Sequence, residues 1–177
     1  MKKKLALLLA LVVSAVGVGA AVPKSVEAAP PGPTIVDVAI AVNSSGPYAG
    51  QFDTLIAAVL AADPAVLATL SGNGQRTVFA PTDDAFAALG LTPANIGTLP
   101  QPVLTEILLY HVVQGRRDAG SVVGARQLRT LYGSFLGQSG GVLTDALGRQ
   151  ANIIVTDVPA ANGIIHAIDA VVLPYAP

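Results

Sequence analysis

One group of residues has the chain order found in some serine hydrolases. A G-x-S-x-G pattern, which is typical of a nucleophile elbow, surrounds Ser139. Asp145 or Asp157, and then His166, follow it along the chain. Such an elbow needs a strand before the serine and a helix directly after it. Residues 142–148 are too short and too closely bounded by glycine to form that helix. We therefore interpret the pattern as a polar hairpin turn and predict no catalytic residues.

Other kinds of chemistry lack the residue types that they need. The sequence has 177 residues and no Cys, which excludes disulfides, zinc ribbons, iron–sulfur sites and thiol catalysis. Its two histidines, His111 and His166, leave little for metal binding. Asp83 and Asp84 are adjacent, but no further ligand lies near them in the sequence, so we expect a helix cap rather than a metal site. We predict no enzymatic activity, no metal and no cofactor.

The N-terminal segment has the pattern of an export signal. Lysines at positions 2–4 precede an apolar run from Leu5 to Val22, and Pro23 and a Val-Glu-Ala stretch at 26–28 follow before the expected cleavage point. We predict a signal peptide over residues 1–28, and a secreted or cell-envelope protein. A retained membrane anchor is the alternative, because the run reaches the lower length limit of a membrane span. Residues 29–33 read as a short Pro-rich linker, and after cleavage no membrane span is expected.

The charge of the remaining chain disfavours nucleic acids as partners. Residues 29–177 contain six Arg and no Lys against ten acidic residues, whereas phosphate neutralisation needs clustered cations. Four of the six arginines fall between Arg116 and Arg129. We interpret them as a solvated hairpin edge, with an anion-binding patch as the alternative.

Helices are predicted mainly in the first half of the chain. Thr34 has the position of an N-cap for a short helix. Apolar residues recur at helical spacing from Phe52 to Leu60, which predicts an amphipathic helix. A further helix is expected to turn Phe86 and Leu89 inward. Another runs from Pro102 to His111.

Strands are predicted mainly in the second half. Thr77–Ala80 has the composition of a short buried strand, and glycines punctuate short apolar runs after Val112. Two longer strands are expected at Asn152–Val158 and Ile164–Leu173, the second apolar on both faces and therefore central in its sheet. Helices followed by strands indicate an α+β fold rather than alternating βαβ units.

Three segments together resemble one family. They are TVFAPTDDAF at 77–86, LLYHVV at 108–113 and NGIIHAIDAVVLP at 162–174. Their order and separation closely resemble the fasciclin domain over about residues 33–175, so we assign a fasciclin-like domain to residues 34–177. The resemblance implies a wedge of mixed β-structure with helices packed on it. It also implies an extracellular or cell-surface module that is associated with adhesion and often lacks enzymatic activity.

Five motif residues are predicted to specify the fold. The Thr82 hydroxyl and the Asp83 carboxylate can accept hydrogen bonds from free N–H groups at a helix start. Asn162 and Gly163 form a turn signal. His166 lies within the predicted central strand, where it must be hydrogen-bonded, since an unpaired buried polar group costs roughly 1–3 kcal/mol.

Tyr110 and His111 are the candidate interaction residues. The family resemblance implies that this tyrosine–histidine segment contributes to receptor recognition in animal members. His111 also shares a helical face with Leu104 and Ile107, which predicts a buried neutral imidazole bonded to the backbone. We therefore treat the pair as structural first.

The leading functional hypothesis is a secreted, non-enzymatic adhesion or matrix-interaction module. Its partner would be an extracellular protein or polysaccharide surface, and homo-oligomers would add avidity. The alternative is an extracellular carrier of an apolar small ligand, carotenoid- or lipid-like, as the resemblance implies for some fasciclin-like proteins. The high hydrophobic fraction of 52% could serve such a carrier by lining a groove.

Overall fold

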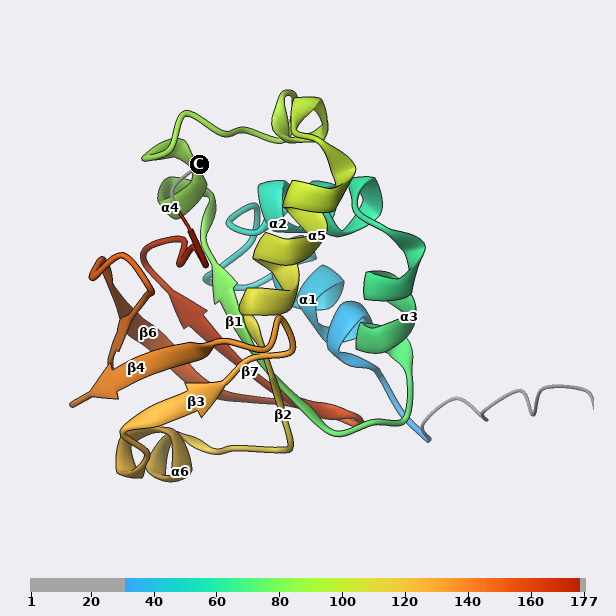
Figure 1. The fold of residues 1–177 in the computed structure, drawn as a ribbon. Coiled ribbons are helices and arrows are strands. Elements are labelled where there is room, and N and C mark those ends of the chain that lie inside the picture. The colour runs from blue at the N-terminus through green and yellow to red at the C-terminus, as the bar shows by residue number, and fades with distance from the viewer. Residues whose placement is uncertain (1–30, 176–177) are drawn as a thin grey trace, which may run out of the picture.

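The computed structural model describes residues 31–175, so the predicted signal peptide and the first two linker residues lie outside the described residues. Helices dominate the first half of the chain and strands the second, which confirms the predicted α+β class (Figure 1). The helices are α1 (Ile35–Ser44), α2 (Asp53–Ala61), α3 (Pro64–Ser71), α4 (Asp83–Ala87), η1 (Ile96–Thr98), α5 (Gln101–Tyr110) and α6 (Ala119–Gly124).

Local capping explains where α1 and α3 begin. Thr34 and Asp37 form a capping box, in which the Thr34 hydroxyl accepts from the Asp37 N–H and the Asp37 carboxylate accepts from the Thr34 N–H. Asp63 caps α3, where Pro64 occupies the first helical position. Within residues 31–175 no single helix is both long and apolar enough to cross a membrane. The pair α2 and α3 reaches that length together but is bent by 118°.

Two helical predictions need correction. Phe86 is buried as expected, but Leu89 is 40% exposed because α4 ends at Ala87 and the chain turns away. Helix α6 was not predicted, since Gly120 and Gly124 suggested turns between strands. Asp118 starts this helix by accepting a hydrogen bond from the Ser121 N–H.

The strands form one seven-stranded, strongly curved sheet. They are β1 (Arg76–Pro81), β2 (Val112–Gln114), β3 (Gln127–Arg129), β4 (Phe135–Ser139), β5 (Val142–Thr144), β6 (Gln150–Ala160) and β7 (Gly163–Ile168). Their order is β2-β1-β7-β6-β5-β4-β3, and only β1 and β7 are parallel neighbours within the described chain. A single bridge between Val113 and Thr130 brings the two ends of the sheet together, so the sheet nearly closes into a barrel.

Two apolar cores lie on opposite sides of β1 and β7. Val78 and Ala80 of β1, and Ile165 of β7, pack with the helices α1 to α5. Phe79 and Ile168 pack instead inside the curved sheet. All six residues of β7 are buried, which confirms that this strand is central. Figure 1 shows the helices covering one side of β1 and β7 while β3, β4 and β6 curve around the other.

The last strand is shorter than predicted. It ends at Ile168 rather than near Leu173, because Asp169 binds across to β6. The Asp169 carboxylate accepts hydrogen bonds from the backbone N–H and the side-chain amide of Asn152, both at 2.7 Å. The chain then leaves the sheet, with Val171 and Leu173 in the helical core and Val172 in the sheet core.

Gly163 is required by a close backbone approach rather than by a turn. Asn162 does lie in the turn that joins β6 to β7, as expected, but neither Asn162 nor Gly163 has the positive φ of an Asn-Gly hairpin turn. A Cβ atom at Gly163 would instead overlap the carbonyl of Arg76 on β1 and lie 2.7 Å from Ile35 Cδ1. The parallel pairing of β1 with β7 therefore leaves no room for a side chain here.

Gly163→Ala should destabilise the fold by about 3 kcal/mol or prevent folding, because the obstruction is backbone. Gly124→Ala is the matched control, since a Cβ at Gly124 meets nothing within 4 Å and its φ is not left-handed. Denaturant unfolding of both variants would measure the difference. Equal free energies of unfolding for the two variants would contradict this account of Gly163.

Candidate functional site

His111 joins the end of α5 to the C-terminal segment. Its Nδ1 lies 2.8 Å from the Ile107 carbonyl, and its Nε2 lies 3.2 Å from the backbone N of Val172. Because the Val172 N–H can only donate, Nε2 accepts and Nδ1 carries the proton. Burial of the ring lowers the pKa of His111 to about 4. The imidazole is therefore neutral at pH 7, and its predicted burial and backbone bonding are both observed.

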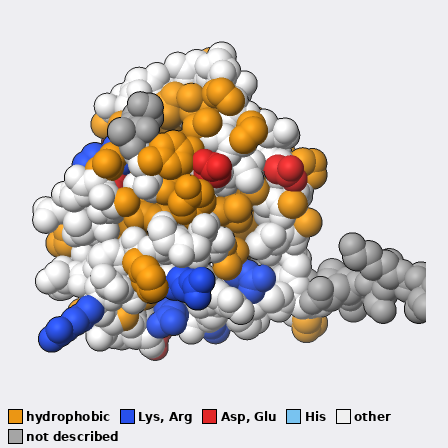
Figure 2. Space-filling view, viewed as in Figure 1, with side chains coloured by type: hydrophobic (Ala, Val, Ile, Leu, Met, Phe, Trp, Pro, Cys, Tyr) orange, Lys and Arg blue, Asp and Glu red, His pale blue; other side chains and the backbone are white. Residues whose placement is uncertain are grey.

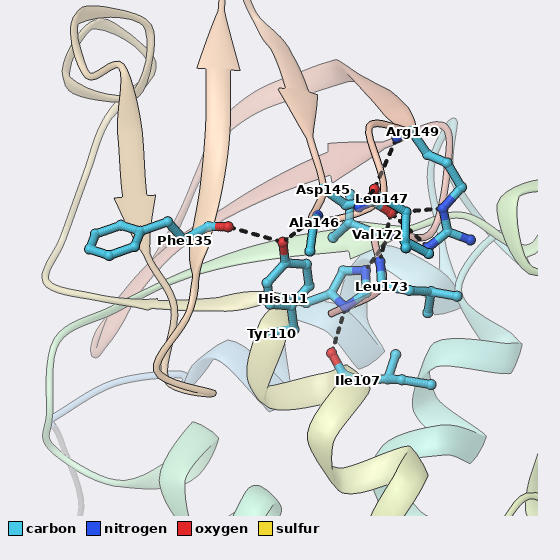
Figure 3. A network of polar contacts seen from close by, with 10 residues as sticks. All are labelled: Ile107, Tyr110, His111, Phe135, Asp145, Ala146, Leu147, Arg149, Val172 and Leu173. Carbon is cyan, nitrogen blue, oxygen red and sulfur yellow. Dashed lines mark hydrogen bonds and ion pairs between the residues drawn. The ribbon is translucent and has the colours of Figure 1, made fainter. Parts of the chain in front are cut away.

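Tyr110 lies beside His111 and bonds to a different part of the chain (Figure 3). Its hydroxyl donates to the Phe135 carbonyl on β4 at 3.1 Å and accepts from the Ala146 N–H at 3.2 Å. The ring packs edge-to-face against Tyr132 and is fully buried. Burial raises the pKa of Tyr110, so the phenol stays protonated at neutral pH.

Asp145 completes this polar network, and sequence reasoning considered it only as a triad member. Its carboxylate accepts from the backbone N–H groups of Leu147, Arg149 and Leu173. The Arg149 guanidinium forms an ion pair with it at 2.7 Å. Burial alone would raise the pKa of Asp145. Its hydrogen bonds outweigh burial and hold the pKa below its usual range; they come from the Leu173 N–H, the Arg149 side chain, and the N–H groups of Arg149 and Leu147.

The network has a consequence for recognition. The side chains of Tyr110 and His111 are both buried, so neither can touch a partner directly in this conformation. A role for the pair in recognition stays a prediction, and it would act through the surface that the pair holds in place. That surface consists of the β5–β6 turn, the start of β4 and the C-terminal segment, which the network ties to α5.

Thr82 and Asp83 serve two different helices. The Thr82 hydroxyl accepts from the Ala85 N–H and caps α4, as expected. The Asp83 carboxylate instead accepts from the Thr54 N–H at 2.8 Å, at the start of α2, whose own N-cap residue Phe52 offers no side-chain cap. The expectation that Asp83 caps its own helix is therefore wrong, because the nearest free N–H groups belong to α2.

Asn162 connects three segments from the buried end of β7. Its side-chain oxygen accepts from the Ile35 N–H at 2.8 Å, at the start of α1. Its amide nitrogen donates to the carbonyls of Leu70 and Gly72, at the end of α3. The side chain thus satisfies free groups at two helix ends, which the turn interpretation did not anticipate.

His166 is hydrogen-bonded through both ring nitrogens. Nδ1 accepts from the Asp157 N–H at 3.2 Å, and Nε2 lies 2.9 Å from the Arg117 carbonyl. Its ring stacks on Phe79 with centroids 5.7 Å apart. Asp157 sits at an irregularity of β6 with a φ of 60°, and its carboxylate accepts from the Ala119 N–H of α6. His166 therefore anchors β6 and the segment before α6 to the central strand.

Ser139 lies in a hairpin, not in a nucleophile elbow. It ends β4 and pairs with Val142 of β5 across a Gly140–Gly141 turn, so a strand follows it where an elbow needs a helix. The bonds of Asp145 and His166 described above do not lead to Ser139. Among residues 31–175, no three His, Cys, Asp or Glu side chains are grouped so as to hold a metal ion.

An apolar groove separates α1 from α2 and α3. It encloses about 100 Å³ above β1 and β7. Val36 and Ala39 of α1 face Leu55 and Val59 of α2 across it. Ile40 and Leu60 also line the groove and are 46% and 71% exposed. The Leu60 exposure departs from the predicted buried stripe, because the last turn of α2 borders this groove instead of a neighbouring element.

A model of the fasciclin domain matches residues 50–174, which is most of the chain. The chain belongs to the fasciclin domain family. Protein sll1483 of Synechocystis sp. is 42% identical over 146 residues, covering 80% of this chain and 73% of that protein. The cell surface glycolipoprotein MPB83 of Mycobacterium bovis is 31% identical over 133 residues, covering 75% and 59%.

The fold is also similar to that of a FAS1 domain pair from the insect cell adhesion molecule fasciclin I. The TM-score is 0.51 at 23% identity, and the match covers 65% of this chain and 42% of that one. This likeness supports the fold alone. Among the relatives in sequence, MPB83 is a cell surface protein by name.

The pH dependence of stability provides a test of the His111 geometry. Its pKa is lower in the folded chain, about 4, than its ordinary value of 6.5, so the unfolded chain binds more protons between these values. The free energy of unfolding should therefore fall by about 3 kcal/mol as the pH drops from 7 to 4. Chemical denaturation across this range measures it.

His111→Gln removes the titrating group. The free energy of unfolding should then change little between pH 6.5 and 4, even if the variant is less stable at pH 7. Asp145, whose pKa is lower in the folded chain, keeps most of its contribution to stability down to its ordinary pKa of 3.8, at the lower edge of this range. An unchanged slope in His111→Gln would contradict the assignment.

Proposed function

We propose that this fasciclin domain is a secreted, non-enzymatic module that adheres to an extracellular protein or polysaccharide surface. Its membership of a family with cell-surface and cell-adhesion relatives carries the proposal. The bonding of the ionisable groups inside the fold supports it. His111, His166 and Asp145 bind backbone groups and, for Asp145, Arg149, so their hydrogen-bonding capacity is used in holding the fold.

The surface also carries features of an interaction module. Hydrophobic side chains gather on the upper half of the face in Figure 2, over α4 and α5. The exposed large apolar residues of the described chain include Leu89, Tyr132, Phe135 and Leu147. Exposed apolar groups that gather on one face mark interaction sites in soluble proteins.

A binding assay with residues 29–177 tests the adhesion proposal. We expect saturable binding to immobilised cell-envelope fragments or matrix proteins, and stronger retention when several copies are linked on one bead, because linked copies gain avidity. The thermally unfolded chain and an albumin-coated surface are the controls. Absence of saturable binding to every surface, with or without linkage, would count against adhesion.

The apolar groove supports a second candidate, a carrier of an apolar small ligand. At about 100 Å³ it is smaller than the roughly 300–1,000 Å³ of a site that encloses a drug-sized ligand. A ligand would therefore insert one ring or alkyl segment and cover the exposed Ile40 and Leu60 with the rest. An elongated hydrocarbon, such as a polyene or an acyl chain, has this shape.

Ala39→Phe should fill the groove, and Ala41→Phe is its control, because Ala41 is exposed on the same helix and outside the groove. With cis-parinaric acid as a fluorescent polyene, we expect saturable binding that Ala39→Phe weakens by about tenfold, the equivalent of two buried CH₂ groups. Ala41→Phe should bind normally. Equal binding by both variants would exclude this groove as the ligand site.

A further inference from the structure

Charge is separated between the two halves of the molecule. Residues 34–111 contain six acidic residues and one basic residue, Arg76, whereas residues 112–177 contain five Arg and four Asp. Figure 2 shows most of the basic side chains of this face on its lower part, over the region of β2, β3 and α6, and most of the acidic ones in its upper half. The mild negative charge of the whole chain therefore hides a basic region.

We call this region the arginine strip, and its members are Arg76, Arg116, Arg117, Arg126 and Arg129. Arg76 starts β1, and Arg116 and Arg117 follow β2. Arg126 precedes β3 and Arg129 ends it, so the strip joins segments up to 53 positions apart in the chain. The fold brings these segments together because β1 pairs with β2, and β2 meets the segment after β3 at the Val113–Thr130 bridge.

The positive charge of the strip is not neutralised by ion pairs. Within residues 31–175 the single ion pair is Arg149 with Asp145, outside the strip. Asp118 and Asp157 lie in the same region, but their carboxylates accept from N–H groups at the start of α6. They reduce the local positive charge without forming an ion pair with any strip arginine.

Two members of the strip are free to bind a partner. Arg116 donates from Nη1 to the carbonyls of Ala160 and Gly163, both at 2.9 Å, so part of its function is structural. Arg126 and Arg129 are exposed, and their guanidinium groups form no hydrogen bond or ion pair within the described chain. Exposed guanidinium groups offer paired N–H donors that match carboxylate and sulfate geometry.

An aromatic ring lies next to one of these free cations. Arg129 is directly opposite Phe135 in the antiparallel pairing of β3 and β4, so both side chains leave the same face of the sheet. Phe135 is 54% exposed. A flat apolar ring beside a guanidinium can contact the apolar face of a sugar ring and the acidic group that the sugar carries.

We propose that the arginine strip binds an acidic polysaccharide, a linear chain of sugars that carry carboxylate or sulfate groups. The assignment rests on the proposed adhesion function and names its partner and surface. A linear chain can follow the strip and stay away from the acidic helical half. A planar anionic bilayer would extend beyond the strip toward the acidic half. Charges closer than the Debye length, about 8 Å at physiological salt, are not fully screened, so the acidic half would repel the bilayer.

Binding of residues 29–177 to dextran sulfate and alginate tests the proposal, with uncharged dextran as the polymer control. Arg126→Gln combined with Arg129→Gln should weaken binding by about tenfold or more at low salt, since each cation near an anionic surface contributes about a factor of five. Ala68→Glu combined with Ala87→Glu lowers the net charge equally at exposed helical positions and should change binding less than twofold. Circular dichroism verifies that both double variants fold.

Several results would overturn the proposal. Equal weakening by the two double variants would show that net charge, not the strip, controls binding. Tighter binding to phosphatidylglycerol vesicles or to single-stranded DNA than to both acidic polysaccharides would identify a different partner. Full binding of the arginine double variant to cell-envelope fragments would leave adhesion intact and remove the strip as its surface. Failure of the unmodified chain to bind any surface would remove both proposals.

Discussion

The central constraint on this fold is that β1 and β7 are neighbours and are buried on both faces. Buried polar groups must find partners, so the side chains around the pair are fixed by hydrogen bonding as much as by packing. The Thr77 hydroxyl donates to the Gly115 carbonyl and accepts from the Arg117 N–H, which sets the path of the chain after β2. His166 on β7 fixes the same segment from the neighbouring strand. Both apolar cores therefore depend on a few polar contacts that hold the connecting segments against the central pair.

These polar contacts join segments that are far apart in the chain. Asn162 links the start of α1, 127 residues away, to the end of α3, 90 residues away. Asp83 caps α2, which begins earlier in the chain. Asp145 links the β5–β6 turn to the C-terminal segment. A buried acceptor is favourable only when its donors are in place, since an unsatisfied polar group costs roughly 1–3 kcal/mol. Loss of one partner should thus destabilise several segments together, which makes the helical layer and the sheet mutually dependent despite their separate cores.

Local periodicity was sufficient to predict the α+β class, the central strand and most helices, because each of these depends on neighbouring residues. The missed α6 and the exposed Leu89 are local errors, whereas the errors in the last strand and at Gly163 have their physical cause in longer-range contacts. The last strand ends early because Asp169 finds a partner on β6, and Gly163 is needed because another strand passes close to it. The sequence does mark Asp83 and Asn162 as important motif positions, but their partners are set by the folded topology. Asp145 could have been recognised as structural from Gly148 and Arg149, three and four residues later, which suggest a tight turn with a charged partner.

The family motifs lie largely in the interior, which limits what they can reveal about recognition. Tyr110 and His166 are fully buried, and they are as useful to a module that binds protein as to one that binds polysaccharide. Partner choice must therefore depend on exposed side chains outside the motifs, which can vary without disturbing the buried hydrogen bonds. Arg126 and Arg129 have this character, because neither side chain bonds to the rest of the fold. Because the buried hydrogen bonds of the motifs do not depend on these exposed side chains, the surface charge of this chain is a better guide to a partner than its motifs are.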